Sequence, residues 1–369
     1  MPHIVHVYKD YWPPILGGIE RTVHWMATGL VRRGYEVTVL VNSRERAARE
    51  RELDGVRIVE VGEWRRFASA PLSPGFPAAM RRLKADVWHF HVPNPTGDVS
   101  YLLTQPAGRV VATYHSDIVR QKWALWAYGP VLRRFLARCD VVMPTSPRLI
   151  DSSPFLRAVR EKCEVVPLAM PLDKYERTGA SGLRAREVKA RYKGFPLLVF
   201  LGKLRYYKGL QFLVSAMRSV PHAHALIIGE GPEGPNLEVL ARELGVADRV
   251  HFLGELDDDD VVAHLQAADV FVLPSHLNSE AYGLSQIEAM ACGLPVVSCD
   301  LPTGVPFVNR HGETGLVVPP GDDGALAEAI SRLLSDERLR FAMGEAAYRR
   351  AREVFSVEAM MENLVRIYV

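Results

Sequence analysis

The sequence predicts an α/β protein of two domains, each built around a parallel β-sheet. The chain has 369 residues, and that is enough for two ordinary domains of roughly 100–200 residues each. Short apolar runs alternate with helical patterns along most of the chain, which is typical of βαβ units. A segment rich in Pro, Gly and charge divides this alternating series in two.

The first series starts at the N-terminus. Residues 4–8 (IVHVY) form a predicted buried strand, and Gly34 ends a helix whose apolar positions are Val23, Met26, Ala27, Leu30 and Val31. This helical spacing is followed by a strand at 37–40 (VTVL), which completes a βαβ unit. Further strands are expected at 56–61, 86–90, 109–114 and 140–145.

The second series follows the dividing segment, which we interpret as a linker over residues 171–194. Its strands are expected at 197–202, 224–229, 250–254, 269–274, 295–299 and 314–319. A last helix is expected at about Ser356–Val369, with Ser356 as its N-cap. The predicted domains are therefore residues 1–170 and 195–354, with the terminal helix at 355–369.

Composition and charge narrow the class of protein. Hydrophobic residues make up 48 % and charged residues 24 %, as in ordinary globular proteins. Residues 1–180 hold 26 Lys and Arg against 18 Asp and Glu, whereas the remainder holds 19 against 25. A basic first half suggests an anionic partner, and chance asymmetry is the alternative. The four cysteines show no C-x-x-C spacing, so we expect reduced thiols in a cytosolic protein without a signal peptide or membrane span.

Ligands of open parallel sheets bind beyond the carboxyl ends of the strands, so the loops after each strand are the places to search. The loop KDYWPPILGGIE (9–20) has Gly17 and Gly18 just before a helix, where a phosphate could approach the backbone. The G-x-G-x-x-G pattern of nicotinamide-binding proteins is absent. A glycine-rich turn without a ligand is the alternative interpretation.

Two further loops hold a histidine and a group of cations. In TYHSD (113–117), His115 lies at a strand end, where it could donate a hydrogen bond or transfer a proton, unless it is structural. In GKLRYYKG (202–209), Lys203, Arg205 and Lys208 crowd one short loop. A diphosphate would neutralise them, and a solvated basic turn is the alternative.

The segment SEAYGLSQIEAMACGLPVV (279–297) is the most specific of the four. We expect a helix over 283–292, ended by Gly293 and Pro295. The backbone N–H groups at its start could bind phosphate. Glu288 on a largely apolar helix needs a partner, which vicinal ribose hydroxyls would supply and a basic neighbour could supply instead.

Together these segments resemble the retaining GT-B glycosyltransferases of family 4, the glycosyl transferases group 1, and especially its mannosyltransferase-like members. The spacing of Glu280 and Glu288 resembles the family's E-x7-E signature. Lys203 and Lys208 resemble the basic pair of its G-R-L-x-x-x-K-G loop, with Lys203 in place of the usual Arg. The G-G-x-E segment and the strand-end histidine of the family are matched by Gly17, Gly18, Glu20 and His115.

The resemblance covers essentially the whole chain and implies two Rossmann-like domains facing each other across a cleft. It implies that residues 1–170 hold the acceptor, that 195–354 hold the donor, and that the helix 355–369 crosses back to the first domain. The catalytic residues would be His115, Glu280 and Lys208. The donor would be bound by Gly17, Gly18, Lys203, Lys208, Gly229, Gly231, Leu253, Glu280, Ala281, Tyr282, Gly283, Leu284 and Glu288. The acceptor would contact Tyr11, Asn94 and Asp117.

The expected reaction transfers a hexose, with retention of configuration, from a nucleoside-diphosphate sugar to a saccharide or lipid-linked saccharide in polysaccharide or glycolipid biosynthesis. GDP-mannose is the first expectation for the donor and a UDP-sugar the next. The nucleotide sugar is a co-substrate, so we expect no cofactor, and no nucleic acid partner. Two lysines and a helix N-terminus could stabilise the leaving phosphate without a metal. The acidic run 257–260 suits a helix start better than a metal site.

Residues 120–138 (RQKWALWAYGPVLRRFLAR) combine aromatic and basic residues, and WRRF (64–67) is similar. Such stretches suit an anionic membrane surface, and we hypothesise peripheral association with the inner face of the plasma membrane. An ordinary surface helix with its aromatics packed inward is the alternative. Pro130 is expected to interrupt this helix.

Two other functions remain open for this fold. A sugar-nucleotide epimerase would need a different set of acid and base residues. A catalytically inactive subunit that only binds sugar nucleotides is the other, although the joint presence of Lys208, Glu280, Glu288 and His115 argues for an enzyme.

Overall fold

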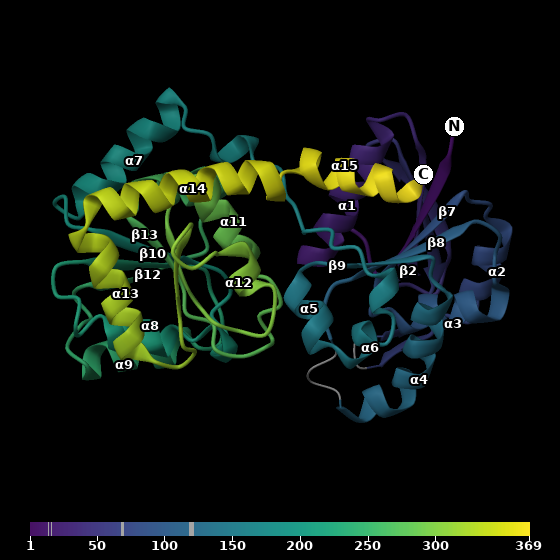
Figure 1. Ribbon diagram of the computed structural model, residues 1–369, viewed down its shortest axis with the longest axis horizontal. Helices are drawn as coiled ribbons and strands as arrows, with labels where there is room; N and C mark the ends of the chain where they lie inside the picture. Colours follow the sequence, from purple (N-terminus) through teal and green to yellow (C-terminus); the bar gives the residue numbers. More distant parts are fainter. Residues whose placement is uncertain (14, 16, 68–69, 118–121) are drawn as a thin grey trace. The chain divides into compact units, whose positions relative to one another are not determined.

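The computed structural model describes residues 1–13, 15, 17–67, 70–117 and 122–369 (Figure 1). The chain forms two compact units. The first comprises Met1–Pro171 together with Ser356–Val369, and the second comprises Leu172–Phe355. Across the described ranges, no helix has both the length and the apolar character needed to cross a membrane.

The first unit is a twisted sheet with helices on both faces. Its strand order is β3-β4-β2-β1-β7-β8-β9, and every pairing is parallel except the one between β3 and β4. The elements are β1 (His3–Val7), α1 (Gly18–Val31), β2 (Glu36–Ser43), β3 (Arg49–Leu53), β4 (Val56–Gly62), β5 (Arg65–Phe67), β6 (Ala70–Leu72), α2 (Phe76–Arg82), β7 (Val87–Val92), α3 (Pro95–Thr104), β8 (Arg109–Tyr114), α4 (Lys122–Arg138), β9 (Val141–Pro144), α5 (Pro147–Ser152), α6 (Pro154–Arg157), the 3₁₀ turn Arg160–Lys162 and α15 (Val357–Tyr368).

Two hydrophobic cores explain why the strands of this unit are apolar on both sides. Ile4 of β1 faces the layer formed by α1 and α15. Val5 and Val7 face the opposite layer, to which α2, α3 and α4 contribute. Parallel strands covered on both faces are expected to be nearly continuous hydrophobic runs, as the strand prediction assumed.

The helix α15 completes the first of these cores. Ser356 caps it, its hydroxyl accepting a hydrogen bond of 3.2 Å from the N–H of Ala359, which confirms the predicted N-cap. Met361 and Leu364 are fully buried. A β-carbon at Gly29 of α1 would lie 2.4 Å from the sulfur of Met361. The close approach of α1 and α15 therefore depends on a glycine.

Two elements of the first unit were not predicted. The strand β3 (REREL) is charged along its length and pairs antiparallel with β4 at the sheet edge. It is held by Glu60, whose carboxylate accepts hydrogen bonds from Arg49 and Arg51. The hairpin β5–β6 was also missed. Apolar residues do not alternate regularly in either segment, because both lie away from the core. The pattern used to predict strands is therefore missing.

The second unit has the strand order β12-β11-β10-β13-β14-β15, with parallel pairing throughout. The predicted strands of the second series are all present, and each end lies within one residue of the prediction. The elements are the 3₁₀ turn Asp173–Tyr175, α7 (Gly179–Arg191), β10 (Leu197–Leu201), the 3₁₀ turn Tyr206–Lys208, α8 (Leu210–Ala216), β11 (His224–Ile228), α9 (Gly234–Glu243), β12 (Val250–Gly254), α10 (Asp258–Ala267), β13 (Val270–Leu273), α11 (Leu284–Ala291), β14 (Val296–Cys299), α12 (Val305–Val308), β15 (Gly315–Val318), α13 (Asp323–Ser335) and α14 (Glu337–Phe355).

The segment 171–194 is not the separate linker that we expected. Its main element, α7, belongs to the second unit and packs against α10. Lys189 forms an ion pair with Asp269, and the carboxylate of Asp269 accepts a 2.7 Å hydrogen bond from the N–H of Leu197. The polar composition that suggested a linker reflects a helix with one narrow buried face, at Ala185 and Val188.

Replacing Leu364 by alanine should destabilise the first unit, because the cavity left in a closed core costs about 2–5 kcal/mol. The measurement is chemical denaturation followed by circular dichroism. Glu362→Ala, at an exposed position of the same helix, is the matched control and should change stability by less than about 0.5 kcal/mol. Equal effects of the two variants would contradict the packing described for α15.

Candidate functional site

In the second unit, the loop after β10 turns one lysine inward. Gly209 has a φ of 69°, and a β-carbon there would lie 2.0 Å from the carbonyl oxygen of Pro274. Only glycine fits this left-handed, crowded position. The turn places the Nζ of Lys208 2.5 Å from a carboxylate oxygen of Glu280. The hydroxyl of Ser275 donates a 2.9 Å hydrogen bond to the same oxygen.

This ion pair is almost withdrawn from water. Lys208 is 9 % exposed and Glu280 is 6 % exposed. Removing two charges from water is costly, and their attraction offsets the cost only when the geometry is good and both partners remain. The pair therefore holds Lys208 against Glu280 in a buried, polar contact.

The three cations of this loop differ in exposure. Lys203 and Arg205 are exposed, whereas Lys208 is buried and paired with Glu280. The loop consequently presents two exposed cations beside one fixed ion pair.

The helix α11 starts next to this ion pair in the sequence. Gly283 is its N-cap, with a φ of 74° and without a side-chain hydrogen bond to the cap. A β-carbon at Gly283 would lie 2.7 Å from both the Nε2 of Gln286 and the Cδ2 of Leu273. The predicted helix over 283–292 is thus confirmed, with Gly283 and Cys292 as its caps. Its first N–H groups carry the positive end of the helix dipole.

The residues before this helix, 281–283, pack against Gly304 and Phe355. The N–H of Gly304 donates a 2.8 Å hydrogen bond to the carbonyl of Ala281. A β-carbon at Gly304 would lie 2.3 Å from the ring of Tyr282. That ring also meets the ring of Phe355 edge-on, with centroids 6.2 Å apart. The backbone of 281–283 is therefore fixed in one position, while Leu284 is half-buried.

Glu288 has a neighbour that the sequence did not reveal. The half-buried Glu288 is hydrogen-bonded to the hydroxyl of Tyr175, a residue that is 1 % exposed. Burial, together with the charge of Glu288, raises the pKa of the Tyr175 hydroxyl. The hydrogen bond from Tyr175 thus gives this carboxylate a partner without ribose or a basic residue. A carboxylate has two oxygens, so it can accept further hydrogen bonds as well.

Gly229 and Gly231 allow two loops to meet. Their β-carbons would lie 2.2 Å from the carbonyl oxygen of Gly202 and 2.3 Å from that of Leu204. The N–H of Leu204 donates a 2.9 Å hydrogen bond to the carbonyl of Glu230. These glycines therefore hold the loop of Lys203 against the loop after β11.

Leu253, expected beside the nucleotide base, lines a pocket of about 310 Å³. Arg184 and Glu187 of α7 and His264 of α10 line the same pocket. The acidic run that follows begins α10, as predicted: the carboxylate of Asp257 accepts a 2.8 Å hydrogen bond from the N–H of Asp260. Its neighbours Asp258 and Asp259 form ion pairs with Lys174 and Arg184.

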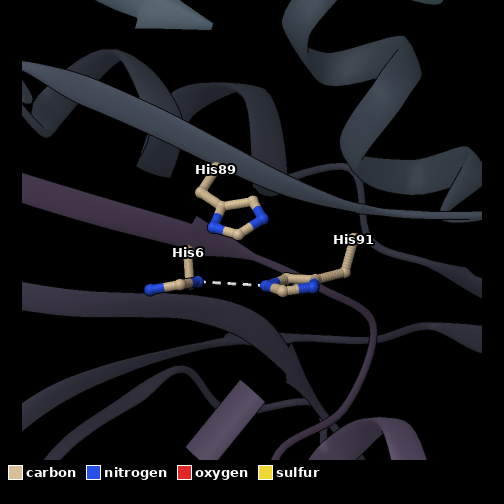
Figure 2. Close-up of side chains that lie close together, drawn as sticks. All are labelled: His6, His89 and His91. Carbon is tan, nitrogen blue, oxygen red and sulfur yellow. Dashed lines mark hydrogen bonds between the residues drawn. The ribbon is translucent and has the colours of Figure 1, made fainter. Parts of the chain in front are cut away.

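In the first unit, His115 belongs to a group of neighbouring buried histidines together with His6, His89 and His91. Its Nε2 lies 3.1 Å from the Nδ1 of His91, whose Nε2 lies 3.0 Å from the Nδ1 of His6. His89 stacks on His91, with ring centroids 4.4 Å apart. Figure 2 shows His6, His89 and His91 together. The sequence singled out His115 alone, although alternate residues of the strand VWHFHV (87–92) place His89 and His91 on one face.

Burial keeps these imidazoles neutral. It lowers the pKa of His6 and of His115 to about 3. The pKa values of His89 and His91 lie well below the ordinary value, mainly because of burial and to a smaller extent because of the neighbouring histidines. His115, at 4 % exposed, can therefore act by hydrogen bonding at neutral pH and not as a cation.

The helix start at Gly17 and Gly18 is covered by a carboxylate. Gly17 is the N-cap of α1, and a β-carbon there would lie 1.9 Å from a carboxylate oxygen of Glu20. Glu20 is 7 % exposed, and burial raises its pKa. The carboxylate occupies the position at which a phosphate was expected, so an anionic ligand would first have to displace it.

The three predicted acceptor residues have structural partners. Tyr11 is buried, with its hydroxyl 3.0 Å from the Nδ1 of His24. Asn94 is fully buried and caps α3, accepting a 3.4 Å hydrogen bond from the N–H of Gly97. Asp117 is half-buried and accepts hydrogen bonds from the hydroxyls of Tyr114, at 2.5 Å, and Ser153, at 2.7 Å. Of the three, Asp117 is the most accessible to a ligand.

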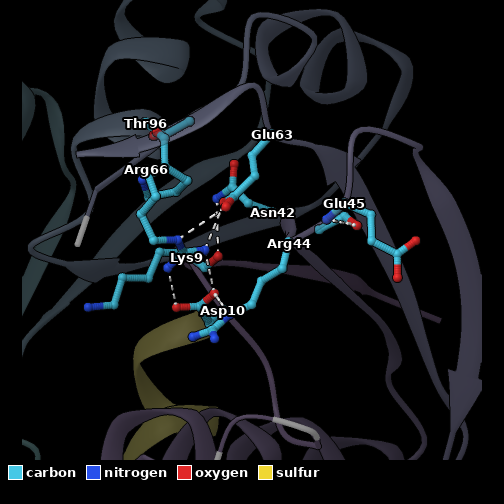
Figure 3. A network of polar contacts seen from close by, with 10 residues as sticks. Lys9, Asp10, Asn42, Arg44, Glu45, Glu63, Arg66 and Thr96 are labelled. Carbon is cyan, nitrogen blue, oxygen red and sulfur yellow. Dashed lines mark hydrogen bonds and ion pairs between the residues drawn. The ribbon is translucent and has the colours of Figure 1, made fainter. Parts of the chain in front are cut away.

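An ion-pair network at the ends of β1 and β4 was missed (Figure 3). Arg66 donates two hydrogen bonds, of 2.7 and 2.8 Å, to the carboxylate of Asp10, and another of 2.8 Å to Glu63. Arg44 lies 3.9 Å from Asp10. Because Asp10 is 4 % exposed, this bidentate contact ties the hairpin β5–β6 to the carboxyl edge of the sheet. Arg66 is therefore not the free surface cation that WRRF suggested.

The aromatic and basic stretch divides between core and surface. Tyr128 is buried and donates a hydrogen bond to Asp98, whereas Trp126 is 86 % exposed. Arg120 and the side chains of Lys122 and Trp123 lie outside the described residues. The exposed cations of the stretch are Arg133, Arg134 and Arg138. The expected interruption at Pro130 is wrong, since α4 continues through it; a proline removes one helix hydrogen bond but leaves φ compatible with a helix.

Comparison with known proteins identifies the family. Residues 183–350 match "Glycosyl transferases group 1" and residues 16–174 match "Glycosyltransferase Family 4". The chain is 32 % identical over 367 residues to an O-antigen chain mannosyltransferase from Escherichia coli, covering 99 % of this chain and 97 % of the relative. The chain belongs to the group 1 glycosyltransferases. Membership makes this protein a glycosyltransferase enzyme.

Other relatives agree with the assignment. This glycosyltransferase is 35 % identical over 355 residues to a D-rhamnosyltransferase from Pseudomonas aeruginosa, which covers 96 % of this chain and 92 % of the relative. Sucrose-phosphate synthase from Thermosynechococcus elongatus has the same fold, with a TM-score of 0.79 at 23 % identity over 100 % of this chain and 98 % of the other. The protein HepE from Anabaena, solved with UDP, also gives 0.79, at 18 % identity over 99 % of each chain. The fold of this glycosyltransferase is therefore GT-B.

The buried histidines should make this glycosyltransferase less stable in acid. An unfolded histidine has a pKa of about 6.5, so the unfolded state binds more protons than the folded state below that pH, and stability falls as the pH drops from about 6.5 towards 3. For His6 the loss is on the order of 2 kcal/mol at pH 5. We expect the stability difference between the wild type and His6→Gln to shrink by about this amount between pH 7.5 and pH 5.

Urea denaturation at the two pH values measures this difference. His222→Gln, at an exposed position, is the control and should show a constant difference from the wild type. A difference for His6→Gln that does not change with pH would mean that His6 has the same pKa in the folded and unfolded states, which would contradict its burial as a neutral imidazole.

Proposed function

We propose that this enzyme transfers a hexose from a nucleoside-diphosphate sugar, with retention of configuration, to a saccharide or lipid-linked saccharide in polysaccharide or glycolipid biosynthesis. The observation that supports it most is the buried Lys208–Glu280 pair, which precedes the uncapped start of α11. A cation, a carboxylate and the backbone N–H groups of a helix start are the groups needed to hold a diphosphate and a sugar.

In this proposal the donor diphosphate binds Lys208, Lys203 and the start of α11, from Tyr282 to Leu284. Glu280 accepts hydrogen bonds from hydroxyls of the donor sugar, and Glu288 accepts them from the ribose. Gly229 and Gly231 keep the loop of Lys203 in place, and Leu253 flanks the base. Lys203 retains the charge of the family's arginine without its planar fork, so its contact with phosphate is a single point charge.

The reaction forms one bond and breaks another on the same face of the sugar. The oxygen of the acceptor hydroxyl bonds to the anomeric carbon while the bond from that carbon to the phosphate oxygen breaks. The bonding pair leaves with the nucleoside diphosphate, and the hydroxyl proton passes to an oxygen of the leaving phosphate. Lys208, Lys203 and the helix dipole stabilise the developing negative charge, which is electrostatic catalysis without a metal.

The donor that we favour is GDP-mannose, with a UDP-sugar next. At least three of the relatives are named as mannosyltransferases. Two of them are an O-antigen chain enzyme and a phosphatidyl-myo-inositol enzyme, the latter 28 % identical over 370 residues. A third is named as GDP-mannose-dependent and is 31 % identical over 376 residues. The names of these relatives also favour an acceptor in glycan or glycolipid assembly.

Two observations support an enzyme over an inactive binding subunit or an epimerase. Lys208 and Glu280 are both present and hydrogen-bonded, and His115 is buried at the end of β8 with its Nδ1 unpartnered among the described residues. A subunit that only binds nucleotide would not need His115.

We further propose a peripheral location at the inner face of the plasma membrane. Among the described residues, exposed apolar side chains gather on neighbouring elements, because β6 packs against α3 and α3 packs against α4. They are Trp64, Phe67, Leu72, Val99, Leu103 and Trp126. With the exposed Arg65, Arg133 and Arg134, this set has the apolar and cationic character of an interfacial surface.

The donor site can be tested by thermal shift with GDP, UDP, ADP and dTDP, followed by their sugar conjugates, each with and without EDTA. We expect a selective stabilisation by one nucleotide that EDTA does not change, because binding to the native state raises the melting temperature. A shift that EDTA abolishes would overturn the metal-free mechanism. If none of these compounds raised the melting temperature, the proposed donor site would be contradicted.

Lys208→Met should lower kcat/KM by about 10²–10³, the usual cost of losing one group that stabilises the developing charge. The double variant Lys208→Met, Glu280→Gln removes the unpaired buried carboxylate and separates lost folding from lost catalysis. Arg218→Ala, an exposed cation after α8, is the matched control and should leave kcat/KM unchanged.

Membrane association can be tested by sedimentation with vesicles that contain anionic lipid. The wild type should sediment at low salt, because basic residues near an anionic surface contribute about 1 kcal/mol each. Replacing Phe67 and Trp126 by serine should reduce binding. Leu183→Ser, an exposed apolar residue of the second unit, should not. No sedimentation of the wild type would exclude this surface.

A further inference from the structure

Three buried histidines of the first unit form a continuous hydrogen-bonded row. It runs from His6 on β1 through His91 on β7 to His115 after β8, with nitrogen–nitrogen distances of 3.0 and 3.1 Å. Figure 2 shows the first of these bonds, between the rings of His6 and His91. Each contact joins an Nδ1 to an Nε2, so the row has a direction.

The protonation states in the row depend on one another. A neutral imidazole has one N–H and one lone pair, and all three rings are neutral because burial lowers their pKa values. If His91 donates from Nδ1 to His115, its Nε2 must accept from His6. If His91 instead accepts at Nδ1, its Nε2 must donate to His6. The three rings therefore share one of two arrangements.

The two ends of the row decide between these arrangements. Among the described residues, the Nε2 of His6 and the Nδ1 of His115 are buried without a hydrogen-bond partner. An N–H buried without a partner is rarer than an unsatisfied acceptor. His6 lies within β1, whereas His115 follows β8 at the carboxyl edge of the sheet, where ligands of parallel sheets bind. The Nε2 of His6 is therefore best left as the lone pair. Each N–H then lies on Nδ1, and the last one, on His115, has no hydrogen-bond partner among the described residues.

We propose that His6 and His91 are positioning residues that hold His115 as the Nδ1–H tautomer, so that His115 donates a hydrogen bond to a hydroxyl oxygen of a bound sugar. This inference rests on the proposed function. A tautomer fixed before binding costs no reorganisation when the sugar arrives, and the wrong tautomer would present a lone pair to the same oxygen.

His89 supports this row without belonging to it. It stacks on His91 with an interplanar angle of 27°, and its two ring nitrogens contact the hydroxyls of Tyr368, at 2.6 Å, and Thr113, at 2.7 Å. Ligand atoms of His6, His89 and His91 all lie within 4.8 Å of one another. Stacked rings, however, do not aim their in-plane lone pairs at one point, and both nitrogens of His89 already have partners. A hydrogen-bonded row fits this geometry better than a metal site.

The direct test is ¹⁵N NMR of protein labelled at the histidine ring nitrogens, with each ring assigned from its single variant. Protonated and unprotonated ring nitrogens resonate far apart, so the spectrum reports the tautomer of each ring. We expect Nδ1–H on His6, His91 and His115 in the wild type. Nε2–H on His115 would overturn the proposal. This reading needs no turnover, so it is separate from the success or failure of the proposed transferase activity.

The kinetic test compares two substitutions of His6. The amide nitrogen of His6→Asn lies close to the position of Nδ1 and keeps a donor to His91, whereas His6→Leu removes it. We expect His6→Leu to give a mixture of His115 tautomers and to lower kcat by about 10-fold, with KM for the donor unchanged. His6→Asn should retain kcat within about twofold. His115→Ala should reduce kcat by more than either.

The controls exclude general damage and a metal. Val5→Ala, on the opposite face of the same strand, should lower stability without changing the tautomers. Equal losses for His6→Leu and His6→Asn would assign His6 a packing role and overturn the proposal. So would a stoichiometric transition metal in the purified protein that is lost in His89→Gln.

Discussion

In both units, parallel pairing of buried strands is the constraint on which the rest of the structure depends. It requires helices on both faces and brings the carboxyl ends of the paired strands to one edge of each sheet. The loop of Lys208, the start of α11 and the loop after β8 with His115 lie at such edges as a consequence. Residues in the loops at these edges can change without disturbing the buried strands. Charged and polar side chains can therefore gather there, although the strands themselves are apolar.

The polar groups at these edges are stabilised in two different ways. Lys208 and Glu280 are buried as a charged pair with Ser275 completing the hydrogen bonds. The histidines are buried by losing charge instead, and their rings satisfy one another. In the proposed reaction, the first arrangement provides charge for a leaving phosphate. The second provides a directed donor without charge, so each suits a different part of the proposed glycosyl transfer.

Several residues that were predicted to bind a ligand have structural roles in the fold. Gly229 and Gly231 permit two loops to touch, Asn94 caps α3, and Tyr11 contacts His24. Glu20 covers the start of α1. A residue type that suits a ligand also suits a tight turn or a helix cap, because both require small or hydrogen-bonding groups. Burial and partners distinguish these uses, and neither can be read from spacing.

The sequence by itself determined the two α/β halves, most of the strands, the helix over 283–292, the N-cap at Ser356, and the family to which the chain belongs. These features depend on local periodicity and on short motifs, which are visible along the chain. Only the tertiary structure decided that α7 belongs to the second unit, that Arg66 pairs with Asp10, that Tyr175 bonds to Glu288 and that three histidines form a row. Each of these contacts joins residues distant in sequence, and pairing at such distances is set by strand order and packing, which no local pattern encodes.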